Sequence, residues 1–215
     1  MVRIGPDAML PKTRTLWSKQ DRHKGDRARL FAAVAEAVAA RRVLYPGSYV
    51  DLAASFAFPD VTYADIDKRA AAFFADRDGT DEIIAENGID PATRRVRFVH
   101  ADYTTLDLPE QGFDLLVSLY AGFVSEACTR LLKVGGTLLV NPSHGDAAMA
   151  SIDPRYRLSG AVLSRDGGYR VTRDRLDRFL VPKRPGAISR DSLRASQRGV
   201  VYTTPAFAYL FERVA

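Results

Sequence analysis

The chain has 215 residues, of which 47% are hydrophobic and 27% charged, and its formal net charge is +5 at pH 7. This length and composition predict a globular protein whose core folds without disulfides or metals, and they exclude a disordered chain. Cys128 is the only cysteine, so no intramolecular disulfide can form. We expect a small core residue at this position, with a nucleophile as the alternative.

Neither a secretory signal nor a membrane span is expected. Residues 1–20 mix proline and basic residues with scattered apolar ones, and they lack the apolar stretch of a signal peptide. No uninterrupted apolar run approaches the length needed to cross a bilayer. We therefore expect a soluble, cytoplasmic protein.

Positive charge is concentrated toward the two ends of the chain. Residues 1–30 contain eight Lys and Arg against three acids, residues 31–150 ten against seventeen, and residues 151–198 twelve against five. Clustered arginines attract phosphate and carboxylate groups through bidentate hydrogen bonds. A solvated surface of mixed charge explains the same pattern. An anionic small molecule is therefore one expected partner, and RNA is an alternative through Arg155, Arg157, Arg165, Arg170, Arg173, Arg175 and Arg178.

Hydrophobic periodicity predicts alternating helices and strands up to residue 150. The first helix is expected over 26–41, with Leu30, Val34, Ala37 and Val38 on one face. Strands are then expected over 42–45, 60–65, 95–100, 113–119 and 137–140, and helices over 68–75 and 124–133, the second ended by Gly135-Gly136. This alternation predicts a doubly wound α/β fold, whose mostly parallel sheet is covered by helices on both faces.

The pattern changes after residue 150. Asp166-Gly167-Gly168 separates two β-rich runs and predicts a hairpin turn, and short helices are expected over 174–180 and from Ser189. Alternating aromatic residues predict a closing antiparallel strand over 205–214. The chain is thus expected to form one domain, with an extension over 1–25, a cofactor-binding core over 26–150, an insertion over 151–204 that could form a substrate wall, and the closing strand over 205–215.

Two aspartates follow predicted strands and are candidates for nucleoside binding. In doubly wound sheets, ligands bind beyond the carboxyl ends of the strands, where the strand order reverses. Asp65 ends the second strand, 18 positions after Gly47, and a carboxylate accepts both hydrogen bonds of a ribose diol. Asp102 ends the third strand and could accept a hydrogen bond from an adenine amino group. Capping of a helix or loop is the alternative for both residues.

The order of the elements and the residues at the strand ends resemble the class I S-adenosylmethionine-dependent methyltransferases. The resemblance covers residues 27–140 and, more weakly, 205–214. It rests on the cofactor loop at 43–48, the acidic motif at 61–67, the adenine motif at 99–102, and the fourth and fifth strands at 113–118 and 131–140. It implies a Rossmann-like fold, S-adenosylmethionine as cofactor and a small-molecule acceptor. The implied cofactor contacts are Tyr45, Pro46, Gly47, Ser48, Asp51, Asp65, Ile66, Asp102, Tyr103 and Ser118.

The cofactor loop departs from the family pattern. Tyr45 and Pro46 stand where an acid and a glycine are usual, and Gly47 is the only glycine of the loop. Proline removes a backbone donor and tyrosine adds bulk. Ser48 could supply a hydroxyl, and Asp51 a displaced carboxylate for the amino group of the cofactor. Alternatively, the site is partly filled and the protein keeps the fold without the reaction.

If the chain is a methyltransferase, its catalysis depends mainly on the alignment of the two reactants. His144 follows the fifth strand and is the candidate general base, and Tyr120 follows the fourth and is expected to line the acceptor pocket. A surface histidine is the alternative for His144. The other two histidines and the single cysteine lack metal-ligand spacing, so no metal site is expected.

Three functions are therefore compatible with the sequence. The first is methyl transfer to a small molecule. The second is a non-catalytic regulatory or binding role in a protein with the methyltransferase fold. The third is binding or modification of RNA through the arginine-rich segment. A nicotinamide dehydrogenase is disfavoured because Gly-x-Gly-x-x-Gly does not follow the first strand.

Overall fold

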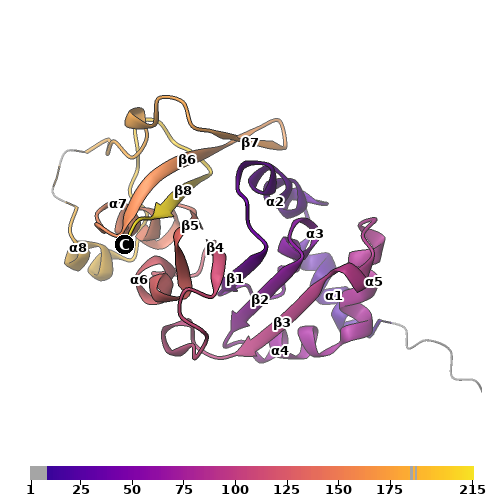
Figure 1. Ribbon diagram of the computed structural model, residues 1–215. Coiled ribbons are helices and arrows are strands. Elements are labelled where there is room, and N and C mark those ends of the chain that lie inside the picture. Colours follow the sequence, from indigo (N-terminus) through magenta and orange to yellow (C-terminus); the bar gives the residue numbers. More distant parts are fainter. Residues whose placement is uncertain (1–8, 185, 187) are drawn as a thin grey trace, which may run out of the picture.

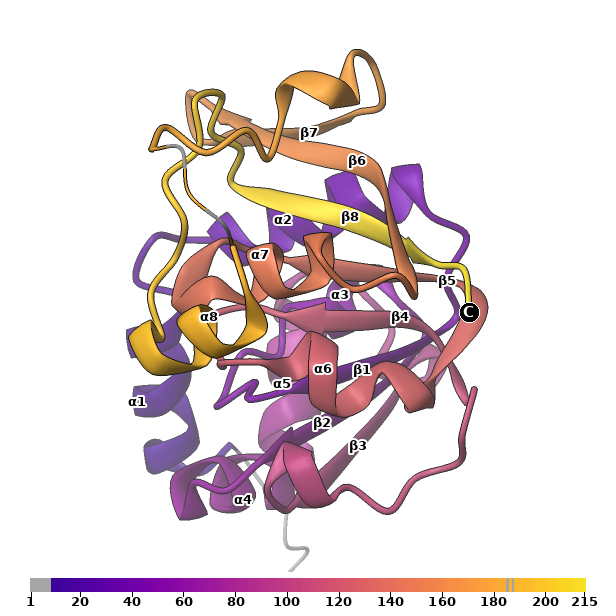
Figure 2. The ribbon, with the colours of Figure 1, turned by 90° about the vertical axis from the view of Figure 1, so that its left-hand side faces the viewer.

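The computed structural model describes residues 9–184, 186 and 188–215, and these residues form one eight-stranded sheet flanked by helices (Figure 1, Figure 2). The strands are β1 (Arg42–Pro46), β2 (Asp60–Asp65), β3 (Arg95–His100), β4 (Phe113–Ser118), β5 (Leu132–Val140), β6 (Tyr156–Arg165), β7 (Gly168–Thr172) and β8 (Ala208–Arg213). The α-helices are α1 (Pro11–Gln20), α2 (Asp26–Ala37), α3 (Ala54–Ala57), α4 (Lys68–Ala75), α5 (Arg77–Glu86), α6 (Val124–Cys128), α7 (Asp146–Ser151) and α8 (Arg190–Ser196). The 3-10 turns are η1 (Pro91–Thr93), η2 (Tyr103–Thr105), η3 (Thr129–Leu131), η4 (Ser143–Gly145) and η5 (Leu176–Arg178).

The strand order confirms the predicted doubly wound fold. The order is β3-β2-β1-β4-β5-β8-β6-β7, and β1 to β5 run parallel. β8 pairs antiparallel with β5, placing Leu210 opposite Leu139, as expected for a closing strand. The chain moves outward from β1 to β3 and then returns to β4, so the order reverses between β1 and β4. Doubly wound sheets bind their ligands beyond the carboxyl ends of the strands at this reversal.

Two apolar clusters cover the two faces of the sheet. Leu30 and Val34 of α2 pack on one face, together with Val43 of β1. Leu44, the next residue of β1, packs on the opposite face with Val124 of α6. Successive side chains of a strand point to opposite faces, and here both faces are buried. This explains why the central strands read as continuous apolar runs rather than as an alternating pattern.

The first helix is shorter than the sequence predicts. α2 ends at Ala37, and Val38 already has an extended backbone (φ −130°). The predicted extension to residue 41 was wrong because the chain must turn within four residues to enter β1 at Arg42. Arg173, from the far end of the sheet, donates a hydrogen bond to the carbonyl of Ala37 at 2.6 Å and so satisfies one carbonyl at the helix end.

Gly135-Gly136 does not cap a helix, which corrects another prediction. α6 ends at Cys128, and the glycines lie inside β5. Phe113 pairs with Leu132, but Leu115 pairs with Thr137, so β5 carries extra residues here. Gly135 has a φ of 82°. A bulge in a strand and a helix C-cap both favour a glycine with positive φ, so the local sequence does not distinguish them.

The last third of the chain contains the predicted hairpin and capped helix. β6 and β7 are joined through Asp166 (φ 50°) and Gly167 (φ 74°), the positive values that a two-residue hairpin turn requires. Ser189 caps α8 through a reciprocal hydrogen-bonded box with Ser192. The helix expected over 174–180 contains only the turn η5. α1, α3, α5 and α7 are helices that the sequence analysis did not predict.

Candidate functional site

A cavity of about 240 Å³ lies at the carboxyl ends of β1, β2, β3 and β4, and we call it the Asp65 cavity. The parallel strands bring their ends to one edge of the sheet, so residues far apart in sequence meet there. Predicted site residues in its wall are Gly47, Asp65, Ile66, Asp102, Tyr103 and Tyr120. The remaining wall residues, which were not predicted as site residues, are Ala64, Ala101 and Ala121. Their small side chains leave the space that the other residues border.

Asp65 keeps part of its hydrogen-bonding capacity free. One carboxylate oxygen accepts the backbone N–H of Tyr49 at 2.7 Å, and the other accepts that of Asp67 at 2.8 Å. These bonds fix the rotation of the carboxylate. A carboxylate has about four acceptor positions, so about two remain. Asp65 is half-buried at the cavity wall, where a diol could reach them.

Asp102 and Ile66 border the same cavity with different chemistry. Oδ1 of Asp102 accepts both the backbone N–H and the hydroxyl of Thr104 at 2.8 Å. These two bonds lower the pKa of Asp102, so its carboxylate is ionised at neutral pH. Ile66 is 66% exposed, which is unusual for a large apolar side chain. The cavity thus offers an apolar surface between two carboxylates.

A second cavity of about 280 Å³ adjoins the first, and we call it the His144 cavity. Tyr103, Tyr120 and Ala121 belong to the walls of both cavities. The wall of the His144 cavity is completed by Gly122, Phe123, His144 and Gln197. The structure therefore brings together His144 and Tyr120, the two catalytic candidates, and Gln197 comes from the insertion predicted to form a substrate wall.

The backbone of the His144 cavity is strained at three positions. Tyr120, His144 and Gln197 have φ values of 63°, 57° and 48°, which residues with a Cβ seldom adopt. Nδ1 of His144 lies 2.7 Å from the hydroxyl of Ser143, which orients the ring. Asn141 accepts the backbone N–H of Tyr120 at 3.3 Å. Such strain persists where the surrounding structure holds it, often at functional sites.

The remaining polar residues of the cofactor loop are buried. Tyr45, Ser48 and Asp51 are 2%, 3% and 1% exposed. The hydroxyl of Tyr45 donates to Asp51 at 3.0 Å, and Nε of Arg27 lies 3.6 Å from the same oxygen. Burial raises the pKa of Asp51, and the Arg27 charge opposes this shift. Pro46, also buried, ends β1. These side chains are engaged with the protein itself rather than with a cavity.

The loops that follow β1 and β4 touch each other. A Cβ placed on Gly47 would lie 2.3 Å from the Cβ of Ala121, so only a glycine fits at this position. Gly47 also has a φ of 63°, which favours glycine independently. Gly122 is packed in the same way, since a Cβ there would lie 2.7 Å from the hydroxyl of Tyr103. The space between the two loops is therefore filled by the chain.

A buried carboxylate that the sequence analysis missed joins three elements near this edge. Asp146 of α7 accepts the hydroxyls of Ser118 and Ser125, each at 2.5 Å, and the backbone N–H of Ser125 at 3.1 Å. Burial raises the pKa of Asp146 to about 6. Ser118, predicted to contact a cofactor, thus donates its hydroxyl to Asp146. The signal in the sequence was an aspartate in the first turn of a short, unpredicted helix.

Several arginines of the basic segment already have partners. Arg155 pairs with Asp153 at 2.6 Å, Arg157 with Glu212 at 2.7 Å and Arg165 with Asp166 at 3.3 Å. Arg173 is bonded to the end of α2, as described above. Four of the seven arginines that would bind RNA are therefore partly neutralised or occupied within the protein.

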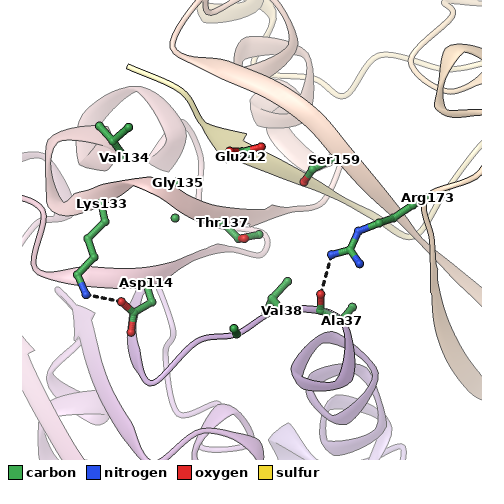
Figure 3. Close-up of a pocket in the computed structure, with 12 residues that line it drawn as sticks. Ala37, Val38, Asp114, Lys133, Val134, Gly135, Thr137, Ser159, Arg173 and Glu212 are labelled. Carbon is green, nitrogen blue, oxygen red and sulfur yellow. Dashed lines mark hydrogen bonds and ion pairs between the residues drawn. The ribbon is translucent and has the colours of Figure 1, made fainter.

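A third cavity, of about 460 Å³, lies between the end of α2 and the amino ends of β4 and β5, at the opposite edge of the sheet (Figure 3). Its charged groups are already engaged. Lys133 pairs with Asp114 at 2.5 Å, and Arg173 points to the carbonyl of Ala37 (Figure 3). Lys133 is thus neutralised by Asp114, and Arg173 is held at the end of α2, so we assign no ligand to this cavity.

Cys128 is a core residue, as predicted. It is fully buried, its thiol donates to the carbonyl of Tyr103 at 3.4 Å, and burial raises its pKa to about 12. Within residues 9–184, 186 and 188–215, no three His, Cys, Asp or Glu side chains are grouped to hold a metal ion. In the same part of the chain, no helix combines the length and apolar character of a membrane span.

Comparison with known proteins bears on the fold. No family model matches the chain, and no curated protein matches it in sequence. Among solved structures, a putative O-methyltransferase from Klebsiella pneumoniae has a TM-score of 0.50 and 14% identity over 79% of this chain and 89% of that chain. Cofactor-bound Rv0187 from MTB has a TM-score of 0.48 and 16% identity over 79% and 89%. YcgJ from Bacillus subtilis has a TM-score of 0.40 and 22% identity over 58% and 54%, so the match spans about half of its length.

Proposed function

We propose that this chain, which has the fold of the class I S-adenosylmethionine-dependent methyltransferases, binds an adenine nucleoside in the Asp65 cavity. The observation that carries the proposal is the half-buried carboxylate of Asp65, held in the cavity wall with about two acceptor positions unused. Ribose hydroxyls are donors that match such a carboxylate. Exposed Ile66 supplies an apolar surface for a base, and Asp102 supplies an acceptor for its amino group.

The cofactor that this fold implies is S-adenosylmethionine, and the residues present fit only its adenosine half. The adenosine half requires the Asp65 cavity, which is open. The amino-acid half requires free polar groups near the loop after β1, but Tyr45, Ser48 and Asp51 are buried there. The proposal therefore favours a binding role in a protein with the methyltransferase fold, and no reaction is derived from the missing half of the site.

Methyl transfer to a small molecule is the second candidate. It is favoured by the wall that the Asp65 and His144 cavities share, because a donor in one would face an acceptor in the other. In that case His144, oriented by Ser143, would take the proton of the acceptor, and Tyr120 would line the acceptor site. S-adenosylmethionine would supply the methyl group. This candidate requires Ala121 to move away from Gly47.

Calorimetric titration with adenosine tests the first proposal. Asp65→Ala removes the acceptors for two ribose hydroxyls, and charged hydrogen bonds contribute about 1.5–3 kcal/mol each. We therefore expect the affinity for adenosine to fall at least about 100-fold. Asp90→Ala is the matched control, because Asp90 caps η1 at the other end of β3. Circular dichroism verifies that each variant is folded.

Two results would contradict the proposal. The first is a folded wild-type protein that does not bind adenosine at all. The second is adenosine binding that Asp65→Ala leaves unchanged, because the nucleoside would then be bound elsewhere.

A further inference from the structure

We infer that the site selects adenine nucleosides without an amino-acid tail, such as adenosine and 5′-deoxy-5′-methylthioadenosine, over S-adenosylmethionine and S-adenosylhomocysteine. The inference rests on the proposed function, because it takes the Asp65 cavity as the nucleoside site. It specifies which nucleosides the cavity accepts. The contacts around Gly47, Asp51 and Ala121 are the observations that support it.

The path that a tail would follow is closed. A ligand longer than a nucleoside extends across the crevice where the strand order reverses, here between β1 and β4. At that place Gly47 touches Ala121 so closely that a Cβ on Gly47 would lie 2.3 Å from the Ala121 methyl. The backbone of Gly47 is therefore in contact with the methyl group of Ala121, and no ligand atom fits between them. The same two residues border the Asp65 cavity, so its wall ends where the tail would begin.

The ammonium group of a tail would find no free acceptor beyond this contact. An ammonium group requires an acceptor, but Asp51 is 1% exposed, accepts from the hydroxyl of Tyr45 and the backbone N–H of Ala53, and forms an ion pair with Arg27. Arg27 and Asp51 form an internal ion pair whose attraction would be lost if either turned to a ligand. Breaking a buried pair by removing one partner is strongly unfavourable.

The carboxylate of an amino-acid tail would find little stabilisation from Arg27 or from helix α3. The guanidinium of Arg27 lies 5.1 Å from the ring centroid of Tyr120 and 5.9 Å from that of Phe207, so it packs among aromatic rings. Its Nη1 has no hydrogen-bond partner among the described residues, but this atom is buried and so is not open to a ligand, and Nε faces Asp51. The helix after β1, α3, has only four residues. A helix of one turn has a weak dipole for stabilising an anion.

The size of the site agrees with a small ligand. Pockets for drug-sized ligands have volumes of about 300–1,000 Å³, and the Asp65 cavity has about 240 Å³. The neighbouring His144 cavity shares Tyr120 and Ala121 with it, and Asp51 belongs to neither wall. This volume therefore suits a nucleoside with a 5′ substituent of one or two heavy atoms better than a ligand with a charged amino-acid chain.

Titration of the wild-type protein with four ligands tests the inference without any variant. The ligands are adenosine, 5′-deoxy-5′-methylthioadenosine, S-adenosylhomocysteine and S-adenosylmethionine. We expect the two tail-less nucleosides to bind at least roughly tenfold more tightly than the two with tails, since opening the Gly47–Ala121 contact costs about as much as disrupting a packed methyl group.

Ala121→Gly then tests the cause of the selectivity. The variant removes the methyl group that closes the passage, so we expect S-adenosylhomocysteine to gain roughly tenfold in affinity relative to adenosine. Ala92→Gly, at an exposed position of η1, is the matched control and should leave the ratio unchanged.

The outcomes separate this inference from the proposed function. If S-adenosylhomocysteine binds the wild type as tightly as adenosine does, and Asp65→Ala abolishes both, the inference is wrong and the proposed function stands. If Ala121→Gly leaves the affinity ratio unchanged, the Gly47–Ala121 contact is not the cause and the inference is also wrong. If none of the four ligands binds, the proposed function itself fails.

Discussion

The two sides of the crevice at the carboxyl ends of the strands use their carboxylates in opposite ways. Asp65, on the β2 side, is half-buried and bonded only to backbone N–H groups, which orient it and leave acceptor positions free. Asp51, in the loop after β1, is buried and bonded to two side chains of its own protein. Solvent access and existing partners therefore decide whether an acidic residue such as Asp65 or Asp51 can bind a ligand, and its position in a motif does not.

We expect the largest loss of stability when the buried carboxylate of Asp51 is removed. Asp51→Ala leaves Arg27 without its ion-pair partner and Tyr45 without its acceptor. Removing one member of a buried pair destabilises a protein by about 3–5 kcal/mol, and we expect this loss in the free energy of unfolding measured with urea. Asp65→Ala should cost less, because its lost partners are two backbone groups near solvent. Equal losses of unfolding free energy for Asp51→Ala and Asp65→Ala would contradict the distinction between the two carboxylates.

The second prediction concerns pH and the buried carboxylate of Asp146. Its pKa in the folded protein is about 6, above the value of 3.8 for a free side chain. The folded state therefore binds the proton more tightly, so the stability that this group contributes is complete below pH 4 and is lost as the pH rises through 6. The difference of about two units corresponds to about 3 kcal/mol.

Asp146→Asn removes this titration while it keeps a side chain that can hydrogen-bond to Ser118 and Ser125. The unfolding free energy of the variant relative to wild type should therefore rise by about 2.5 kcal/mol between pH 4 and pH 7. Urea titrations at both pH values measure it. A constant difference between variant and wild type across this range would show that Asp146 does not titrate there.

The third prediction compares two glycines with positive φ. Gly47→Ala meets both backbone strain and the Ala121 methyl, whereas Gly167→Ala in the hairpin turn meets strain alone, with no atom within 4 Å. Strain in the left-handed region costs about 1–2 kcal/mol, and overpacking adds about 1–3 kcal/mol. Thermal unfolding should therefore show a clearly larger loss for Gly47→Ala. Equal losses would mean that the loops after β1 and β4 are not in contact.

We expect the smallest change in stability when an exposed ion pair is broken. Arg157→Ala breaks the pair with Glu212, in which Arg157 has an exposed side chain. Exposed ion pairs contribute about 0–1 kcal/mol, so the unfolding free energy should hardly change. This variant is also the reference for Asp51→Ala, since both remove one member of an ion pair. A loss above about 2 kcal/mol would contradict the distinction between exposed and buried pairs.

Much of the fold was predictable because it depends on local patterns. The strands over 60–65 and 95–100 and the helix over 68–75 begin and end where expected. They are bounded by turn or capping residues such as Asp67, the N-cap of α4. Gly135-Gly136 was misassigned because a bulge and a helix cap require the same backbone conformation.

The site was predictable only in part. The positions of Asp65 and His144 in cavity walls at the carboxyl edge of the sheet could be predicted, because both residues follow predicted strands. The pairing of Asp51 with Arg27 joins residues 24 positions apart, and the closure of Gly47 on Ala121 joins two loops that no local pattern connects. Such contacts follow from packing, so the sequence indicated an unusual loop and left open whether the site is filled.

The decisive experiment is a crystal structure of the protein with adenosine bound. We expect both ribose hydroxyls to donate to the carboxylate of Asp65 and the base to lie over Ile66, while the Arg27–Asp51 pair and the Gly47–Ala121 contact are kept. Adenosine bound at another place would contradict nucleoside binding in the Asp65 cavity, and a complex in which Asp51 has left Arg27 to face the ligand would contradict the closed crevice.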